Sequence, residues 1–561
     1  MVVTALCTAA WILHLRHVDS VHFSWQPRQH HGMWPLSTLP EELVMAEMSA
    51  RRRMLVLATV CLAAFAINID TTIVNIALPD LGRDLGATTR NLQWIVDGYN
   101  LAFASLVLTA GALGDRFGRR PALLVGLAGF AISSGIGAVV GSASALVALR
   151  LVMGASAAVI FPTTLSIITN AFPDRRERAT AIGVWGAVTG LGVAIGPVTG
   201  GLLLAHFGWP SVFVALVPVA LLALVATWAF VPESSDPAEA RLDLPGLALS
   251  TAAVGTLVYT IIEAPGRGWD SPATLAGLGG TVALAAAFIA TERRRPRPMI
   301  DITLFRTPAF SAASASVTVA FFALFGFIFV VTQYFQFVRG YGSLSAGVRI
   351  LPVAITIAIG SVGGVVLAGR VGTRTVVTIG LLLLGSSFGW IALSPTFMSY
   401  DSIVGQMVLM GLGLGLTTAP ATESILSVLP PAKAGVGSAV NDATRELGGT
   451  LGVAVLGSIF STLYADRLAT GSFHLLPGRV VSAAQNSVAA ALATVSHAPA
   501  GPARQQLLEA VHASFMSGFH VACIVAAGAC LLGAAGALLL PGRNRQPSTE
   551  PTSPEPATIA A

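Results

Sequence analysis

The stretch NIDTTIVNIALPDLGRDLGATTRNLQWIVDGYNLAFASLVLTAGALGDRFGRRP, from Asn68 to Pro121, decides the fold. It reads as two apolar helices joined by a short polar loop, and each helix carries one acid, Asp70 in the first and Asp97 in the second. A charge near the centre of a bilayer costs at least about 2.5 kcal/mol, so such acids usually face the protein interior and serve a function. Two of them on consecutive helices predict a protein that moves protons or cations.

The composition of the whole chain supports this interpretation. Of its 561 residues, 54% are apolar and only 11% are charged, against about 25% charged residues in soluble domains. Apolar runs of roughly 20 residues recur, and they must span a membrane as helices, because lipid offers no partner to a bare backbone. We therefore expect an all-α polytopic membrane protein in the lipid bilayer.

The apolar runs after residue 53 predict 14 transmembrane helices. They lie at about 54–78, 92–113, 122–141, 146–170, 180–204, 211–231, 244–263, 272–291, 309–335, 346–368, 375–394, 402–426, 436–463 and 516–540. Most connections are short, so we expect neighbouring helices to be antiparallel.

Three longer polar segments divide these helices. Their positions predict a six-helix bundle at 51–231, two inserted helices with cytoplasmic linkers at 232–308, and a second six-helix bundle at 309–540. The second bundle contains an external loop at about 464–515, for which we expect either an amphipathic surface helix or no regular structure.

The two ends of the chain lack the pattern of the spans. Residues 1–50 are expected to form a cytoplasmic extension that is disordered or mis-started, with Met45 or Met48 as the alternative start, just before an arginine cluster. Residues 541–561 are expected to form a disordered cytoplasmic tail.

The basic residues predict the orientation. Of the 32 basic residues, 20 fall at one side of the expected spans, whereas the short loops of the other side hold only Arg83, Arg90, Arg267 and Arg339. Because cytoplasmic loops carry the excess of Lys and Arg, both termini are expected in the cytoplasm. The formal net charge of +5 comes from arginines at the ends of spans, so no nucleic-acid partner is expected. The Arg-, Ala- and Gly-rich composition favours GC-rich coding and hence an actinobacterial source, and we expect the protein in a bacterial plasma membrane.

The most specific motif is the run Gly111-Ala112-Leu113-Gly114-Asp115-Arg116-Phe117-Gly118-Arg119-Arg120-Pro121. Gly118 permits a tight turn, the arginines anchor it at the membrane surface, and Asp115 is placed to pair with them or to approach a helix N-terminus. Anchoring explains the arginines but not the acid and the glycines together. The run resembles the signature between helices 2 and 3 of the major facilitator superfamily.

Two further motifs carry the same resemblance. Gly192-Val193-Ala194-Ile195-Gly196-Pro197-Val198-Thr199-Gly200-Gly201 matches the antiporter signature of the family in its fifth helix. Small residues on one face let two helices touch closely, and a proline kinks a helix. Arg150-Leu151-Val152-Met153-Gly154 matches the arginine motif of the fourth helix, with Met153 in place of the usual glutamine.

Three stretches narrow the resemblance to one branch. Asn68–Pro79, Trp94–Tyr99 and the region from Ala434 to Gly449 resemble the fourteen-helix drug:proton antiporters, particularly the exporters of quaternary ammonium compounds. The match covers roughly 54–540. The resemblance implies alternating access between two six-helix bundles.

The resemblance also implies roles for the buried charges. Asp97 would exchange a proton with a cationic drug, and helical spacing places it on one face with Gln93 and Asn100. Asp70 lies nearly opposite the polar face of its helix, so it is either a proton carrier or the ion-pair partner of a residue such as Arg150. Arg150 itself is linked in the family to proton transfer, and inside a span it needs an acidic or carbonyl partner.

A second charged cluster begins span 13, at Asn441, Asp442 and Arg445. Acids suit the N-terminus of a helix, and local pairing is the simplest expectation for this cluster. The family implies in addition a gate in which Asp115 meets this end of span 13 when the cytoplasmic side closes.

Together these features predict a proton-coupled antiporter that exports hydrophobic, often cationic drugs. The proton gradient would supply the energy, and we expect no cofactor, no metal site, no enzymatic activity and a monomer. The alternatives are a dedicated exporter of one natural product, as in self-resistance, and a membrane sensor that does not transport. A membrane enzyme is disfavoured, because the chain has no His-Glu-x-x-His and no phosphate-binding loop.

Overall fold

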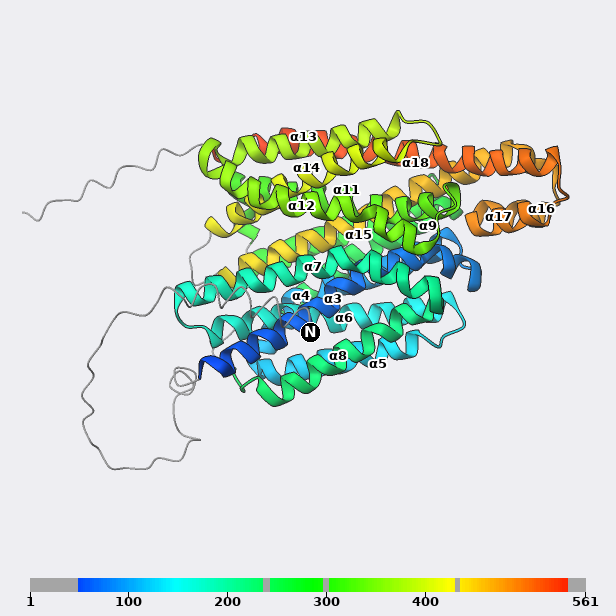
Figure 1. Ribbon diagram of the computed structural model, residues 1–561. Coiled ribbons are helices and arrows are strands. Elements are labelled where there is room, and N and C mark those ends of the chain that lie inside the picture. Colours follow the sequence, from blue (N-terminus) through cyan, green and yellow to red (C-terminus); the bar gives the residue numbers. More distant parts are fainter. Residues whose placement is uncertain (1–48, 236–242, 296–301, 429–433, 543–561) are drawn as a thin grey trace, which may run out of the picture.

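The computed structural model describes residues 49–235, 243–295, 302–428 and 434–542 (Figure 1). The predicted N-terminal extension up to residue 48, with Met45 and Met48, lies outside the described residues, as does the tail from residue 543. In the described ranges every regular element is a helix.

The helices follow one another with short connections. In chain order they are α3 (Ala50–Asp84), α4 (Thr89–Phe117), α5 (Arg119–Gly137), α6 (Ala143–Ala171), α7 (Arg175–Phe207), α8 (Pro210–Phe230), α9 (Leu244–Arg267), α10 (Pro272–Arg294), η2 (Ile302–Arg306), α11 (Pro308–Gln333), η3 (Tyr334–Val338), α12 (Ser343–Val371), α13 (Thr373–Ala392), α14 (Tyr400–Ser427), α15 (Ala434–Thr470), η5 (Ser472–Leu475), α16 (Gly478–Asn486), α17 (Val488–His497) and α18 (Pro502–Ala537).

The predicted all-α membrane fold is confirmed. Among the described residues, 13 helices are individually long and apolar enough to cross a membrane. The fourteenth expected span is α4, which consists of Thr89–Val107 and Thr109–Phe117 with a bend of 56° between them. Helix α4 begins at a capping box between Thr88 and Asn91, an arrangement that satisfies free backbone donors at a helix start.

The last two spans are longer than predicted. We expected 436–463 and 516–540, but α15 continues to Thr470 and α18 begins at Pro502. The region between them forms η5 and the short helices α16 and α17. Hydropathy marks where the lipid ends, whereas a helix continues into water wherever its residues allow, so the apolar pattern underestimates these helices.

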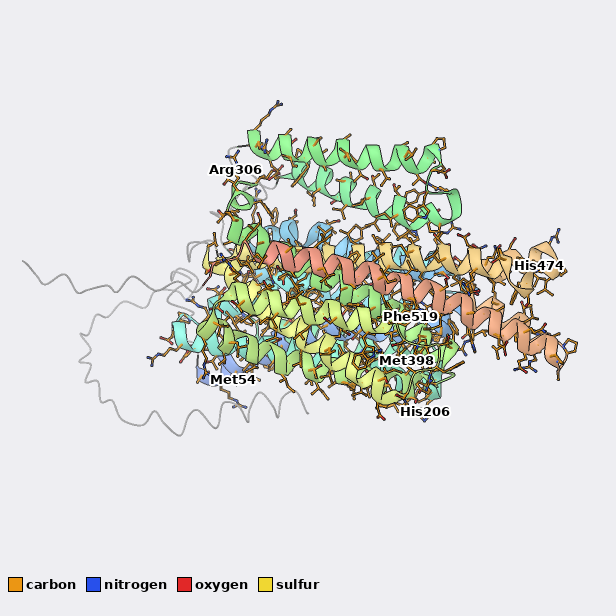
Figure 2. The ribbon with its side chains drawn as sticks, turned by 90° about the horizontal axis from the view of Figure 1, so that it is seen from above. Met54, His206, Arg306, Met398, His474 and Phe519 are labelled. Atoms are coloured by element: carbon orange, nitrogen blue, oxygen red, sulfur yellow. The ribbon has the colours of Figure 1, made fainter. Side chains whose placement is uncertain are left out.

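The long helices form two groups. Helices α3 to α8 pack against one another and are called the N half, and helices α11 to α15 with α18 pack against one another and are called the C half (Figure 1). Helices α9 and α10 pair with each other at the periphery, and α9 lies against α4 of the N half and α15 of the C half (Figure 2). The inserted pair therefore touches both halves.

The two ends of the molecule differ. Met54 and Arg306 lie at one end, which is called the arginine-rich end (Figure 2). Helix α3 begins at this end and α4 runs back towards it, so the 115–120 turn between α4 and α5 also lies here. His206 and His474 lie at the opposite end, which carries α16 and α17 and is called the hairpin end (Figures 1 and 2).

Helix α7 joins the two halves through its glycines. Gly192, Gly196 and Gly200 face α3, where a Cβ on Gly200 would lie 2.8 Å from two isoleucine side chains. Gly201 faces α12, and a Cβ there would lie 2.6 Å from the carbonyl oxygen of Ser343. The motif thus provides close contact with two helices, one from each half, rather than with the single helix that the sequence suggested.

Helix α12 also has a glycine at this contact, Gly347, which faces α7. A Cβ on Gly347 would collide with the carbonyl group of Pro197, and its distance to the carbonyl carbon would be 2.8 Å. Backbone atoms cannot move aside as a flexible side chain does, so a larger residue here must separate α7 from α12.

We predict that Gly347→Ala lowers the thermal unfolding midpoint of the purified protein, because overpacking of a close contact costs about 1–3 kcal/mol. Gly363→Ala, in the same helix, is the matched control, since a Cβ at Gly363 meets nothing within 4 Å. Equal midpoints for the two variants would contradict the assigned contact.

Candidate functional site

A buried ion pair joins α6 to α3. Arg150 is 2% exposed and Asp70 is fully buried, and Arg150 Nη1 donates to Asp70 Oδ1 at 2.8 Å and to Oδ2 at 2.7 Å. Arg150 Nε donates to the carbonyl oxygen of Ile95 at 3.0 Å, and the guanidinium lies 4.4 Å from the centroid of the Tyr99 ring. Of the two roles considered for Asp70, proton carrier and ion-pair partner of Arg150, the structure contains the ion pair.

The acid of α4 has a different environment. Asp97 is fully buried, yet neither of its carboxylate oxygens has a hydrogen-bond partner among the described residues. Gln93 and Asn100 are buried beside it on the predicted face of the helix. The amide oxygen of Gln93 and the amide nitrogen of Asn100 likewise have no hydrogen-bond partner in the described chain.

The contacts of Gln93 show that this face of α4 packs against the C half. Its Nε2 donates to the carbonyl oxygens of Val453 and Ala454, at 3.3 and 3.2 Å. Both acceptors belong to α15 of the C half. Because Asp97 follows Gln93 by four residues, it lies on the same side of α4. The unpartnered acid therefore belongs to the interface between the halves.

The 115–120 turn lies at the arginine-rich end of the N half, and its charged side chains bind within that half. Gly118 has a φ of +110°, a conformation that favours glycine. Arg119 Nε pairs with Asp115 Oδ1 at 2.6 Å, and Arg120 donates to the carbonyl oxygen of Trp228 at 2.7 Å. The guanidinium of Arg116 lies 5.3 Å from the centroid of the neighbouring Phe117 ring. Gly111 faces Pro162 of α6, and a Cβ on Gly111 would lie 3.4 Å from the Cβ of that proline.

The cluster at the start of α15 stays within the C half. Asn441 accepts a hydrogen bond from Thr422 at 2.9 Å. Arg445 lies 3.7 Å from Asp442 and stacks over Phe321, 4.7 Å from its ring centroid. The local pairing that we expected is present. The contact of Asp115 with this end of α15 is absent from the described residues, where Asp115 pairs with Arg119 instead.

Contacts between the halves gather at the hairpin end. Besides the bonds of Gln93, Gln336 Nε2 donates to the carbonyl oxygen of Ile76 at 2.9 Å. Ser487, which lies between the short helices α16 and α17 at this end, places its Oγ 3.4 Å from the carbonyl oxygen of Ala87 in the N half. At the arginine-rich end, the described ion pairs Arg53–Glu177 and Arg119–Asp115 each stay within the N half. The structure therefore has its hairpin end closed.

Two residues of this region were assigned no role from the sequence. Ser458 accepts from Gln93 Nε2 at 3.3 Å, but a lone serine in an apolar run is usual in helix packing. Tyr99 lies within electrostatic reach of Asp70, Arg150 and Glu446, and it occupies the last position of the Trp94–Tyr99 stretch. Only its position two residues after Asp97 could have singled it out.

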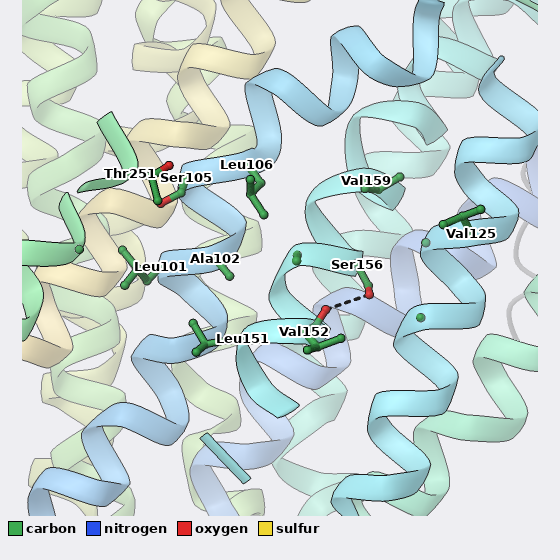
Figure 3. Close-up of a pocket in the computed structure, with 14 residues that line it drawn as sticks. Leu101, Ala102, Ser105, Leu106, Val125, Leu151, Val152, Ser156, Val159 and Thr251 are labelled. Carbon is green, nitrogen blue, oxygen red and sulfur yellow. Dashed lines mark hydrogen bonds between the residues drawn. The ribbon is translucent and has the colours of Figure 1, made fainter. Parts of the chain in front are cut away.

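A separate groove lies on the outer face of the N half. Its volume is about 600 Å³, and its lining is almost wholly apolar. Figure 3 shows side chains from α4, α5, α6 and α9 around it, with Ser105 and Thr251 together at one side. Asp97 is not among its lining residues, so the groove is distinct from the buried acid.

No group of three His, Cys, Asp or Glu side chains in the described ranges is placed to hold a metal ion. The cysteines of those ranges, Cys61, Cys523 and Cys530, are buried, and none of them forms a disulfide.

Two helical halves that meet at one end, with acids buried between and within them, define a secondary transporter. The chain belongs to the Major Facilitator Superfamily, whose model matches residues 60–453. It is therefore a member of a family of transporters and not of enzymes.

The curated relatives include drug exporters. The multidrug efflux pump LfrA of Mycolicibacterium smegmatis is 35% identical over 89% of this chain and 98% of its own length. The tetracenomycin C resistance and export protein of Streptomyces glaucescens is 34% identical over 90% and 94%. The methyl viologen resistance protein SmvA of Salmonella typhimurium is 33% identical over 86% and 96%.

Solved structures show the same fold. A bacterial homologue of the human lysosomal transporter Spinster, in an inward-facing and unoccupied conformation, aligns with a TM-score of 0.60. The two chains share 17% identity, and the alignment covers 88% of this chain and 98% of the other.

We predict that Arg150→Met destabilises the protein by about 3–5 kcal/mol, because it leaves Asp70 buried without a counter-charge. The double variant Asp70→Val, Arg150→Met recovers much of this loss, since no charge remains buried. Thermal unfolding in detergent measures both. Glu177→Ala is the comparison, because it breaks a partly exposed pair of the kind worth about 1 kcal/mol or less. A double variant less stable than Arg150→Met would contradict this account.

Proposed function

We propose that the protein exports hydrophobic, often cationic drugs from a bacterial cell in exchange for protons. The observation that carries this proposal is Asp97, a buried acid at the interface between the halves whose carboxylate has no hydrogen-bond partner among the described residues. An ionised carboxylate is very costly in such a place, so the closed interface suits either a protonated acid or one neutralised by a cation. Proton and cationic cargo would therefore compete for Asp97.

The relatives support the choice of cargo. LfrA is a multidrug efflux pump, and SmvA is a methyl viologen resistance protein. We propose the same class of cargo for this chain, with the proton gradient as the energy source and with a single chain as the working unit. A proton supplies about 2.3 kcal/mol per 100 mV of membrane potential.

We propose an orientation in which the arginine-rich end and both termini face the cytoplasm. The support is the unequal distribution of basic residues, since cytoplasmic loops carry the excess of arginine and lysine. In this orientation the closed hairpin end faces outward, and the cytoplasmic gate at Asp115 and the start of α15 is released. Alternating access would exchange this arrangement for its opposite.

We infer the roles of Asp70, Arg150 and Asp97 from the groups that each of them contacts. Asp70 forms an ion pair with Arg150 within the N half. We propose that this pair stabilises the N half and that its protonation changes when Asp97 gains or loses a proton. Asp97 is assigned the exchange of proton and cargo, with Gln93 and Asn100 as its polar neighbours.

The test uses everted membrane vesicles energised by respiration, with a pH-sensitive dye and a panel of cationic dyes and antibiotics. The parent should release protons when cargo is added, and Asp97→Asn should abolish this response, because the amide cannot exchange a proton. Glu423→Gln is the matched control: it removes an exposed acid from α14 and should leave the response intact.

Other outcomes separate the alternatives. A response to one compound alone would favour a dedicated exporter, as for the relative that confers tetracenomycin C resistance. Cargo binding by purified protein without any proton movement in the vesicles would instead identify a sensor and refute proton antiport.

A further inference from the structure

The inserted helix α9 has one backbone acceptor without its usual partner. In an α-helix, the carbonyl oxygen of a residue accepts from the N–H four residues later. Four residues after Ile261 the chain has Pro265, inside α9, and proline has no N–H. The carbonyl oxygen of Ile261 is therefore free to bind a donor from another helix.

Ser458 of α15 supplies that donor. Its Oγ donates to the carbonyl oxygen of Ile261 at 2.9 Å, and the serine is fully buried. The same Oγ accepts from Nε2 of Gln93 at 3.3 Å. One hydroxyl thus links the inserted helix, the C half and the N half in a single chain of hydrogen bonds.

This chain also orients the amide of Gln93. Its Nε2 is surrounded by three acceptors, namely Ser458 Oγ and the carbonyl oxygens of Val453 and Ala454. The amide is planar, so its Oε1 must point away from them, and Oε1 has no partner in the described chain. Residues four apart are neighbours on a helix surface, so the free acceptor belongs to the face that carries Asp97.

Other contacts hold α9 in place at the same level. Glu263 accepts from Arg90 of α4 at 2.8 Å, and Trp269 donates to Thr462 of α15 at 3.3 Å. Between them, Leu101, Ile262 and Ala454 are buried in one apolar cluster drawn from α4, α9 and α15. Helix α9 therefore lies across the seam between the halves at the hairpin end.

We propose that Ser458 and the proline-freed carbonyl of Ile261 form a clasp that holds the hairpin end closed and fixes the amide of Gln93 beside Asp97. Opening the hairpin end separates α4 from α15, so it must break the bond between Gln93 and Ser458. The inserted pair α9–α10 is then a positioning element of the transport cycle. The proposal rests on the proposed function only in assigning exchange to Asp97.

The experiment measures the distance between the halves at the hairpin end. Spin labels are placed at Val139→Cys of the N half and Leu393→Cys of the C half, positions that are 81% and 89% exposed. Cys7→Ser removes the fourth cysteine of the chain, which lies outside the described residues. Pulsed electron–electron double resonance on detergent-solubilised protein, without cargo or gradient, then measures the distance between the two labels and gives the populations of the closed and open conformations.

Ser458→Ala should raise the ratio of open to closed populations roughly two- to tenfold, the effect of one net hydrogen bond. Pro265→Ala should shift it in the same direction by less, because the restored N–H competes with Ser458 for the same carbonyl. Ser134→Ala is the matched control, since Ser134 is also fully buried and donates to a carbonyl of another helix at 2.9 Å, but entirely within the N half.

Unchanged populations in both Ser458→Ala and Pro265→Ala would overturn the clasp, and so would an equal shift in Ser134→Ala. If one variant fails to fold, the other still decides. The distances do not depend on export, so failure of the clasp is distinguishable from failure of proton antiport in the vesicle experiment.

Discussion

Hydrocarbon offers no hydrogen-bond partner, and this constraint governs every polar group inside the helices. The guanidinium of Arg150 donates hydrogen bonds to both carboxylate oxygens of Asp70 and to the carbonyl oxygen of Ile95. The amide nitrogen of Gln93 donates to three acceptors on α15. Neither carboxylate oxygen of Asp97 has a hydrogen-bond partner among the described residues, and the amide oxygen of Gln93 and the amide nitrogen of Asn100 beside it also lack one. A group that the fold leaves without a partner is free to bind one that comes and goes, such as a proton or a cation.

The same constraint gives the prolines and glycines of the helices their positions. Pro265 removes a backbone donor from α9, and a serine of another helix takes the vacant acceptor. Gly201 and Gly347 let α7 and α12 approach until backbone meets backbone. Both devices act at the hairpin end and both join the halves, so the conformation depends on a few positions where side chains are small or absent.

The class of protein and its buried charges could be predicted from the sequence, because hydropathy detects lipid and an acid in an apolar run is conspicuous. The partners could not be predicted to the same extent. Asp70 was assigned two possible roles, since its position on the helix says only that it points away from the polar face. Gln93 and Ser458 are 365 residues apart, and no local pattern links them. The ends of α15 and α18 were missed because hydropathy detects the bilayer and not the helix.

The groove on the outer face of the N half, about 600 Å³ between α4, α5, α6 and α9, has a practical consequence. In a bilayer, the hydrocarbon tails of lipids fill such an apolar hollow, and after extraction only the alkyl tails of a surfactant are available to do so. An empty hollow forfeits the dispersion contacts of its lining. The length and branching of the surfactant tail therefore become part of the packing of this protein, and we expect solubilised samples to differ in stability according to the amphiphile that replaces the lipid.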